Sequence, residues 1–289
     1  MSAGAPTVRE ILQKSADFLA DRGVDSPALS AQLMLGKALR LTRLDLLLQS
    51  DRPLTEAELA AARELVRRRG RGEPAAYILG EKEFYGLAFS VTPACLIPRP
   101  ETEHIVEEAE ARFPRDAALA FADLGTGSGC LAVTLAVRFP QARGLAVDRS
   151  PGALAVARDN AARHGVGERL SLVQGDFADL AGLGVAQGSL DLVAANPPYV
   201  SEAEYADVSP EVRNFEPRGA LTPGPTGLEA IAALAPGAHA ALKPGGLLLL
   251  EMGMTQAAAV RGILEQAGFA EVRIRKDLAG RDRVAVARA

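Results

Sequence analysis

Apolar residues recur at helical spacing over roughly the first eighty residues of the chain. One such face consists of Val8, Ile11, Leu12, Ala16 and Leu19, and a second consists of Leu29, Leu33, Met34 and Leu39. Intervals of three and four residues are typical of amphipathic helices. Thr55 followed by Glu58 has the form of a capping box, which predicts a further helix to about Arg69. Residues 1–80 are therefore predicted to form a small helical bundle.

A hairpin and a stiff linker are predicted after this bundle. Bulky and small residues alternate over residues 83–92, around Tyr85-Gly86, as in a β-hairpin. The run Leu-Ile-Pro-Arg-Pro-Glu-Thr-Glu at 96–103 contains two prolines, which restrict the backbone, and it leads into a predicted helix over residues 101–112. Residues 81–100 are thus predicted to join the bundle to a larger domain that spans residues 101–289.

The larger domain alternates short apolar runs with helical stretches, which predicts an α/β fold. Five runs have the length of buried parallel strands, at 118–123, 144–147, 170–173, 190–195 and 246–251. Two more candidates, at 270–276 and 283–287, are separated by a turn too short for a parallel crossover, so they predict an antiparallel hairpin. The predicted fold is a seven-stranded, mostly parallel sheet with an antiparallel C-terminal hairpin.

Composition excludes several classes of protein. The net charge of −4 argues against a protein that coats a nucleic-acid backbone, so a protein or small-molecule substrate fits better. The two cysteines, Cys95 and Cys130, form no CxxC pair and have no histidine cluster nearby, so we expect neither a disulfide framework nor a bound metal. Charged residues interrupt the N-terminal apolar positions, and no apolar run of about 18 residues follows, which favours the cytoplasm.

The most informative short run is Asn196-Pro197-Pro198-Tyr199, which directly follows the apolar run at 190–195. Two consecutive prolines remove two backbone N–H donors, so that nearby carbonyls stay free to accept hydrogen bonds from a substrate amino group. Asn196 adds a side-chain carbonyl, and Tyr199 offers a flat aromatic face. This corner predicts a site for a planar amide or amino group, although Asn-Pro is also ordinary turn chemistry.

A glycine-rich loop lies between the first predicted strand and the helix after it. The loop reads Gly125-Thr126-Gly127-Ser128-Gly129. Glycines let a ligand approach the backbone closely, and a helix N-terminus offers unpaired N–H groups, so a nucleotide-like cofactor is predicted. An NAD-binding oxidoreductase is an alternative, but Cys130 stands where the dinucleotide-binding motif has its last Gly or Ala.

Further cofactor contacts are predicted at the ends of the next two strands. Asp148 ends the second strand, where a carboxylate can accept both hydroxyls of a ribose, although a surface turn would also suit an aspartate. Asp176 and Phe177 follow the third strand, and they offer an acceptor for an adenine amino group beside an aromatic face. Phe177 could equally belong to the core. We interpret these residues, with the glycine-rich loop, as one cofactor site.

These residues, in this order and at strand ends, resemble class I S-adenosylmethionine-dependent methyltransferases that modify planar nitrogens. More narrowly, the chain resembles the protein-(glutamine-N5) methyltransferase family, the release factor glutamine methyltransferases. The runs at 73–80 and 96–103, and Phe215-Glu216-Pro217 with Ala220-Leu221, carry this narrower resemblance. Adenine and cytosine N-methyltransferases share the Asn-Pro-Pro-Tyr corner, but not its combination with Ile-Pro-Arg-Pro-Glu-Thr-Glu. Phe177 departs from the family, many members of which carry Trp.

The resemblance implies methyl transfer from S-adenosylmethionine to the side-chain amide nitrogen (N5) of the glutamine in the Gly-Gly-Gln motif of class I peptide-chain release factors. It implies a docking role for residues 1–80, a catalytic role for Asn196, Pro197 and Tyr199, and substrate contact by these residues and Pro198. It also implies that Asn196 contacts the cofactor. Alternatives are glutamine methylation of a ribosomal protein, for which the linker is a poorer match, and adenine-N6 methylation of nucleic acid. Arg99 and Glu101 are further candidates without an assigned role.

Overall fold

The computed structural model describes residues 5–289, which form two compact units. One unit comprises the described residues up to Glu81 together with Ser209–Phe215, and the other comprises Lys82–Val208 and Glu216–Ala289. Residues 1–4, which belong to the predicted bundle, lie outside the described part of the chain.

The first unit is helical, as the apolar spacing predicts. Its helices are α1 (Val8–Asp21), α2 (Pro27–Leu39), α3 (Arg43–Leu48), α4 (Glu56–Gly70), α5 (Ala75–Leu79) and α10 (Pro210–Phe215). Capping boxes begin α1, α3 and α4 at Thr7, Thr42 and Thr55, where the threonine oxygen and the acidic residue three positions later satisfy free backbone N–H groups. An ion pair between the buried Arg69 and the partly exposed Glu211, 2.7 Å long, joins α4 to α10.

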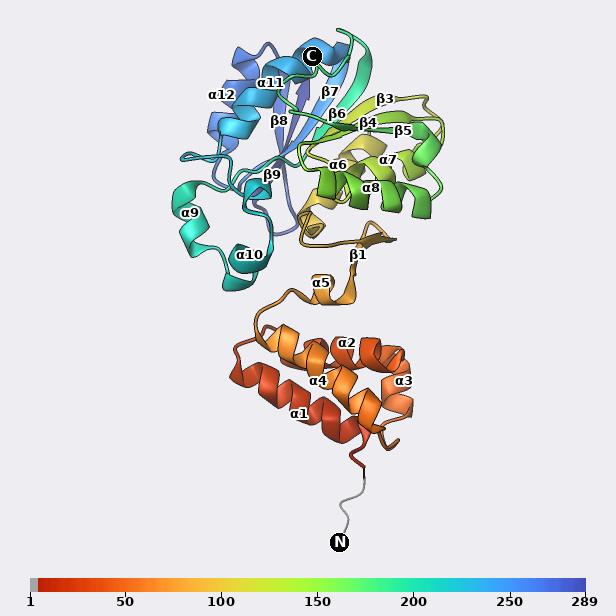
Figure 1. Ribbon diagram of the computed structural model, residues 1–289. Coiled ribbons are helices and arrows are strands. Elements are labelled where there is room, and N and C mark those ends of the chain that lie inside the picture. Colours follow the sequence, from red (N-terminus) through yellow and green to blue (C-terminus); the bar gives the residue numbers. More distant parts are fainter. Residues whose placement is uncertain (1–4) are drawn as a thin grey trace. The chain divides into compact units, whose positions relative to one another are not determined.

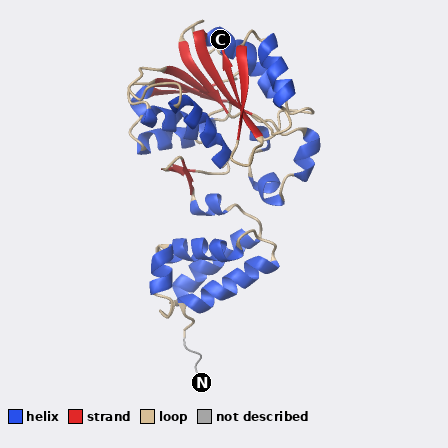
Figure 2. Ribbon diagram, turned by 180° about the vertical axis from the view of Figure 1, so that it is seen from behind, coloured by secondary structure: helices blue, strands red, loops and turns tan. Residues whose placement is uncertain are grey.

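The second unit contains a seven-stranded sheet with the order β5-β4-β3-β6-β7-β9-β8. Figure 2 draws the strands in red. The strands of the sheet are β3 (Ala120–Leu124), β4 (Arg143–Asp148), β5 (Leu170–Gln174), β6 (Leu190–Ala195), β7 (Leu242–Glu251), β8 (Ala270–Lys276) and β9 (Asp282–Arg288). The pairs from β5 to β7 are parallel, whereas β9 runs antiparallel to both β7 and β8. This confirms the predicted fold class.

Helices cover both faces of the sheet, which explains why the central strands β3 and β6 and the second half of β7 are almost continuously buried. One face packs against α6 (Glu103–Glu110), α7 (Cys130–Arg138) and α8 (Pro151–Arg163), around buried residues such as Ile105 and Leu135. The other packs against α11 (Glu229–Ala241) and α12 (Ala257–Gln266), around residues such as Ile231 and Leu264 (Figure 1). The short elements of this unit are α9 (Glu202–Asp207), η1 (Pro100–Thr102), η2 (Gly167–Arg169) and η3 (Arg218–Ala220).

The predicted hairpin and linker pack into this second unit. The hairpin consists of β1 (Glu81–Phe84) and β2 (Leu87–Ser90), and Tyr85 and Gly86 form its turn with φ of 52° and 75°. Phe84 and Phe89 are buried in the same core as α6 and α7. The helix expected over 101–112 starts as η1 and continues as α6 to Glu110, because Pro100 opens a tighter first turn. None of the helices within residues 5–289 is both long and apolar enough to cross a bilayer.

Candidate active site

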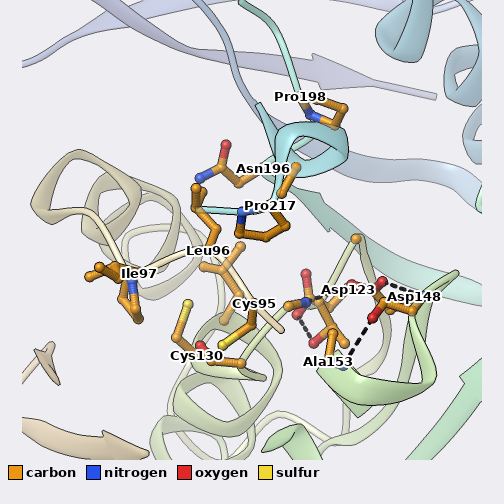
Figure 3. Close-up of a pocket in the computed structure, with 18 of the residues that line it drawn as sticks. Cys95, Leu96, Ile97, Asp123, Cys130, Asp148, Ala153, Asn196, Pro198 and Pro217 are labelled. Carbon is orange, nitrogen blue, oxygen red and sulfur yellow. Dashed lines mark hydrogen bonds between the residues drawn. The ribbon is translucent and has the colours of Figure 1, made fainter. Parts of the chain in front are cut away.

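A cavity of about 200 Å³ opens at the carboxyl ends of β3, β4 and β6 (Figure 3). Ligands of open α/β sheets bind at this edge, since the loops that follow the strands converge there. The cavity walls include the glycine-rich loop, Asp148, Phe177 and Asn196. The structure therefore brings most of the predicted cofactor residues and the Asn196 corner around one space.

The glycine-rich loop adopts a backbone that needs glycine. Gly125, Gly127 and Gly129 have φ of 80°, 56° and 81°, in the left-handed region that other residues rarely adopt. A Cβ atom at Gly129 would also lie 3.1 Å from the Cβ of Ala157, which is tighter than ordinary contact. The loop thereby passes close to α8 and leaves its other side open to the cavity.

Asp148 is held in place by the loops on both sides of it. The Gly127 N–H donates to Oδ2 of Asp148 and the Ser150 N–H donates to Oδ1, both at 2.9 Å. Each carboxylate oxygen can still accept a further hydrogen bond. Since Asp148 lines the cavity, the arrangement fits the predicted contact with a pair of ligand hydroxyls.

Asp123 also lines the cavity, although the sequence-based prediction did not include it as a site residue. Its Oδ2 atom accepts from the Thr126 hydroxyl at 2.6 Å and from the Ala132 N–H at 3.1 Å, whereas Oδ1 is buried with no hydrogen-bond partner. Burial raises the pKa of Asp123 to about 7. A buried acceptor without a partner indicates a missing donor, such as a cationic ligand group. Its place two positions before the glycine-rich loop, near the end of β3, could have suggested this role.

The two predicted adenine contacts differ in position. Phe177 is buried and lines the cavity, with the guanidinium of Arg149 5.9 Å from the centre of its ring. Asp176 is exposed, and its Oδ1 accepts from the Ala178 N–H at 3.0 Å. Asp176 is not among the residues that line the cavity, so its contact with adenine stays a prediction.

The Asn-Pro-Pro-Tyr corner lies where β6 ends, as expected. Asn196 and Pro198 line the cavity, whereas Pro197 and Tyr199 do not. Nδ2 of Asn196 donates to the hydroxyl of Thr102 at 2.9 Å. The Tyr199 hydroxyl donates to Oε1 of Glu251 at 3.0 Å, and burial is the main cause that raises the pKa of this phenol. Neither Thr102 nor Glu251 was predicted from the sequence to belong to the site.

Two segments that carry the narrower resemblance meet at the same cavity. Pro98, Arg99 and Thr102 line it from one segment, and Pro217, Gly219 and Ala220 line it from the other. Oε1 of the buried Glu216 lies 2.6 Å from the guanidinium of Arg99. Glu101, the other candidate without an assigned role, is not part of the cavity wall.

Both cysteines line the cavity, and no histidine does within the described part of the chain. Burial raises the pKa of the Cys95 and Cys130 thiols, so both are protonated near neutral pH. The described residues also contain no group of three or more His, Cys, Asp or Glu side chains that could hold a metal ion. The polar groups around the cavity are the carboxylates, the guanidinium groups of Arg99 and Arg149, several hydroxyls, the loop backbone and Asn196.

Residues 115–268 match the family model described as "Methyltransferase domain". With the strand order and the glycine-rich loop, this match defines a class I methyltransferase. Residues 10–80 match the model of the "PrmC N-terminal domain". The release factor glutamine methyltransferase of Nitratidesulfovibrio vulgaris is 48% identical over 99% of this chain and 97% of its own length, and that of Geobacter sulfurreducens is 44% identical over 96% and 95%. The chain belongs to the family of release factor glutamine methyltransferases.

The fold is also found among solved structures of low sequence similarity. The hMettl16 catalytic domain, solved in complex with the MAT2A 3′UTR hairpin 6, covers 74% of this chain and 81% of its own, with a TM-score of 0.56 and 17% identity. At this identity the similarity concerns the fold alone. The family is established by the relatives of higher identity.

Proposed function

We propose that this protein transfers a methyl group from S-adenosylmethionine to the N5 amide nitrogen of the glutamine in the Gly-Gly-Gln motif of a class I peptide-chain release factor. One observation about the site supports the proposal in addition to family membership: Asn196 and the glycine-rich loop line the same cavity. A cofactor on the loop would lie beside an amide held at Asn196. That proximity is what direct transfer between them requires.

The residues around the loop fit S-adenosylmethionine. The unpartnered Oδ1 of Asp123 suits the ammonium of its methionine part, Asp148 suits the ribose hydroxyls, and the ring of Phe177 suits the adenine face. The cofactor supplies, when bound, a methyl group made electrophilic by a positively charged sulfur. The protein's task is then to exclude water and to aim a nucleophile at that methyl group.

An amide nitrogen is a poor nucleophile because its lone pair is delocalised into the carbonyl. We infer that the Asn196 Oδ1 atom and the Pro197 carbonyl accept the two amide hydrogens and that the Tyr199 ring packs against the amide plane, although of these three residues Asn196 alone lines the cavity. Positioning of this kind can contribute roughly 7–11 kcal/mol at best without a strong base. One amide proton must leave as the methyl group arrives. No histidine of the described residues lines the cavity to take this proton, which leaves to water or along a chain of carbonyls.

The helical unit is proposed to dock the substrate protein. Helix α3 exposes Leu44, Leu47 and Leu48, whose exposed fractions are 63%, 66% and 75%. Neighbouring exposed leucines are a feature of protein-binding surfaces. The proposed partner, which follows from family membership, is a release factor in the cytoplasm, without a proposed role for a membrane or for direct nucleic-acid binding.

Mapping the transferred methyl group tests this proposal. The protein would be incubated with isotopically labelled S-adenosylmethionine and a purified class I release factor, and the labelled peptide would be sequenced by mass spectrometry. A release factor in which alanine replaces the glutamine is the matched control. We expect one label on the glutamine of the Gly-Gly-Gln motif and none in the control. Label that appears only on ribosomal protein or on adenine in nucleic acid, offered in parallel, would contradict it.

A further inference from the structure

A buried network of side-chain hydrogen bonds connects the end of β7 to the Asn196 corner. Glu251 is fully buried, and its Oε2 atom accepts from the Thr102 hydroxyl at 2.6 Å, while Oε1 accepts from the Tyr199 hydroxyl at 3.0 Å. The Thr102 oxygen in turn lies 2.9 Å from Nδ2 of Asn196. Glu251 therefore contacts two residues that border the proposed amide site, although it does not itself line the cavity.

The hydrogens available in this hydrogen-bond network determine which way the Asn196 carboxamide faces. An ionised carboxylate only accepts hydrogen bonds, and a threonine hydroxyl has one hydrogen to donate. Thr102 gives this hydrogen to Glu251, so its oxygen can only accept from Asn196. The Asn196 NH2 group must then face Thr102, which leaves Oδ1 free for the cavity.

We propose that Glu251 and Thr102 are positioning residues, which hold the Asn196 carboxamide with its oxygen toward the substrate amide. This inference rests on the proposed function, because only a substrate that brings N–H donors needs an acceptor there. A reversed Asn196 would present its own NH2 group to the substrate NH2 group, and neither could accept. The same arrangement selects glutamine over glutamate, whose ionised carboxylate offers Oδ1 no hydrogen.

The arrangement requires Glu251 to be ionised. Burial raises its pKa, and the hydrogen bonds from Thr102 and Tyr199 oppose that rise. Among the charged groups that face it, Arg283 of β9 also lowers the pKa and Glu101 of η1 raises it. Protonated Glu251 would itself donate a hydrogen, which frees the Thr102 hydroxyl to donate to Asn196 and allows the reversed carboxamide. Activity should therefore fall on the acid side as Glu251 gains its proton.

Comparing Thr102→Val with Thr102→Ser tests the role of the hydroxyl. Valine keeps the branched shape without the hydroxyl, whereas serine keeps the hydroxyl without the methyl group. We expect Thr102→Val to lower kcat on a release factor on the order of 10- to 100-fold, with the Kd for S-adenosylmethionine changed less than about threefold. Thr102→Ser should retain most of the wild-type rate. Equal losses in the two variants would overturn the inference.

The pH profile of kcat provides a second readout, which holds even if Thr102→Val folds poorly. The kcat of wild-type protein should fall on the acid side with an apparent pKa above the ordinary value of a glutamate. The kcat of Glu251→Gln should be lower than wild type at neutral pH, because its NH2 group donates as protonated Glu251 does, and it should lack this acid-side fall because an amide cannot titrate. If the kcat of Glu251→Gln fell on the acid side with the same apparent pKa as wild type, another group would be responsible for that fall. The role of Glu251 would then be overturned. A wild type that does not methylate glutamine would instead contradict the proposed function itself, which separates the two failures.

Discussion

The guanidinium of Arg99 lies 2.6 Å from Oε1 of Glu216, across 117 residues of sequence. The other oxygen of Glu216 accepts from the Ile97 backbone N–H at 3.1 Å. One buried carboxylate thus binds both the side chain and the backbone of the 96–103 segment. Both segments that it joins line the proposed cofactor cavity, so this ion pair shapes that part of the wall.

Replacing Glu216 with alanine should destabilise the protein and weaken cofactor binding. The change leaves the Ile97 N–H and the partly buried Arg99 without their acceptor, which costs about 2–4 kcal/mol of unfolding free energy. Thermal denaturation measures the stability and calorimetric titration measures the binding. Glu202→Ala is a suitable control, because Glu202 and Arg218 form an exposed pair that should change stability by less than about 1 kcal/mol. Similar melting temperatures for the two variants would contradict the role of Glu216.

Asn196→Ala should reduce methyl transfer by at least about a hundredfold, since it removes one of the two acceptors that orient the substrate amide. Binding of S-adenosylmethionine should stay within roughly tenfold of wild type, which corresponds to about 1.4 kcal/mol. Single-turnover rates on a release factor and calorimetric titration give the two quantities. Unchanged turnover would show that Asn196 does not hold the amide.

Asp148→Ala should have the opposite effect and weaken cofactor affinity first. The carboxylate is proposed to bind the ribose hydroxyls, and it also holds the backbone of Gly127 and Ser150. We expect the Kd to rise on the order of 100-fold, while kcat at saturating cofactor falls much less. Asp159→Ala, at an exposed position of α8, controls for the loss of one negative charge. Equal affinities in the two variants would remove Asp148 from the cofactor site.

Cofactor affinity should depend on pH through Asp123. Its pKa is raised to about 7, chiefly by burial, so below that pH the carboxyl is protonated and offers less to a ligand cation. We expect the affinity for S-adenosylmethionine to fall by up to about tenfold per pH unit below pH 7. Calorimetry between pH 5.5 and 8, in wild type and Asp123→Asn, measures this slope, which the variant should lack. The same slope in both proteins would contradict the assignment.

The raised pKa of Asp123 also makes the stability of the folded protein depend on pH. Between about pH 4 and pH 7 the folded protein binds a proton at Asp123 that the unfolded chain has released. The contribution of Asp123 to the free energy of unfolding therefore decreases as pH rises from about 4 to about 7. Above the pKa of the folded protein this contribution no longer changes. Denaturation midpoints of wild type relative to Asp123→Asn should show this loss. A relative stability that rises with pH over this range would be the contrary result.

Local sequence patterns predicted the sheet and much of the candidate site, because both follow from residues close together in the chain. The run at 190–195 matches β6, and the corner at Asn196 follows it directly. Other features depend on contacts between distant residues. Thr102 and Glu251 are 149 residues apart and Arg99 and Glu216 are 117 apart, so no periodicity connects them. Strand β7 begins at Leu242 rather than at 246, because Leu242 pairs with Leu190 ahead of a register shift. Pro244-Gly245, which resembles a turn in the sequence, lies within that shift.

The proposed function places a cofactor on the glycine-rich loop and a glutamine amide at Asn196 in the same cavity. A structure of the protein with S-adenosylhomocysteine and a peptide that contains Gly-Gly-Gln would locate both. We predict the adenosine part between Asp148 and Phe177, and the amide nitrogen at about 2.7–3.2 Å from both Oδ1 of Asn196 and the Pro197 carbonyl. A glutamine side chain bound outside the cavity, or one that meets the NH2 group of Asn196, would contradict the account.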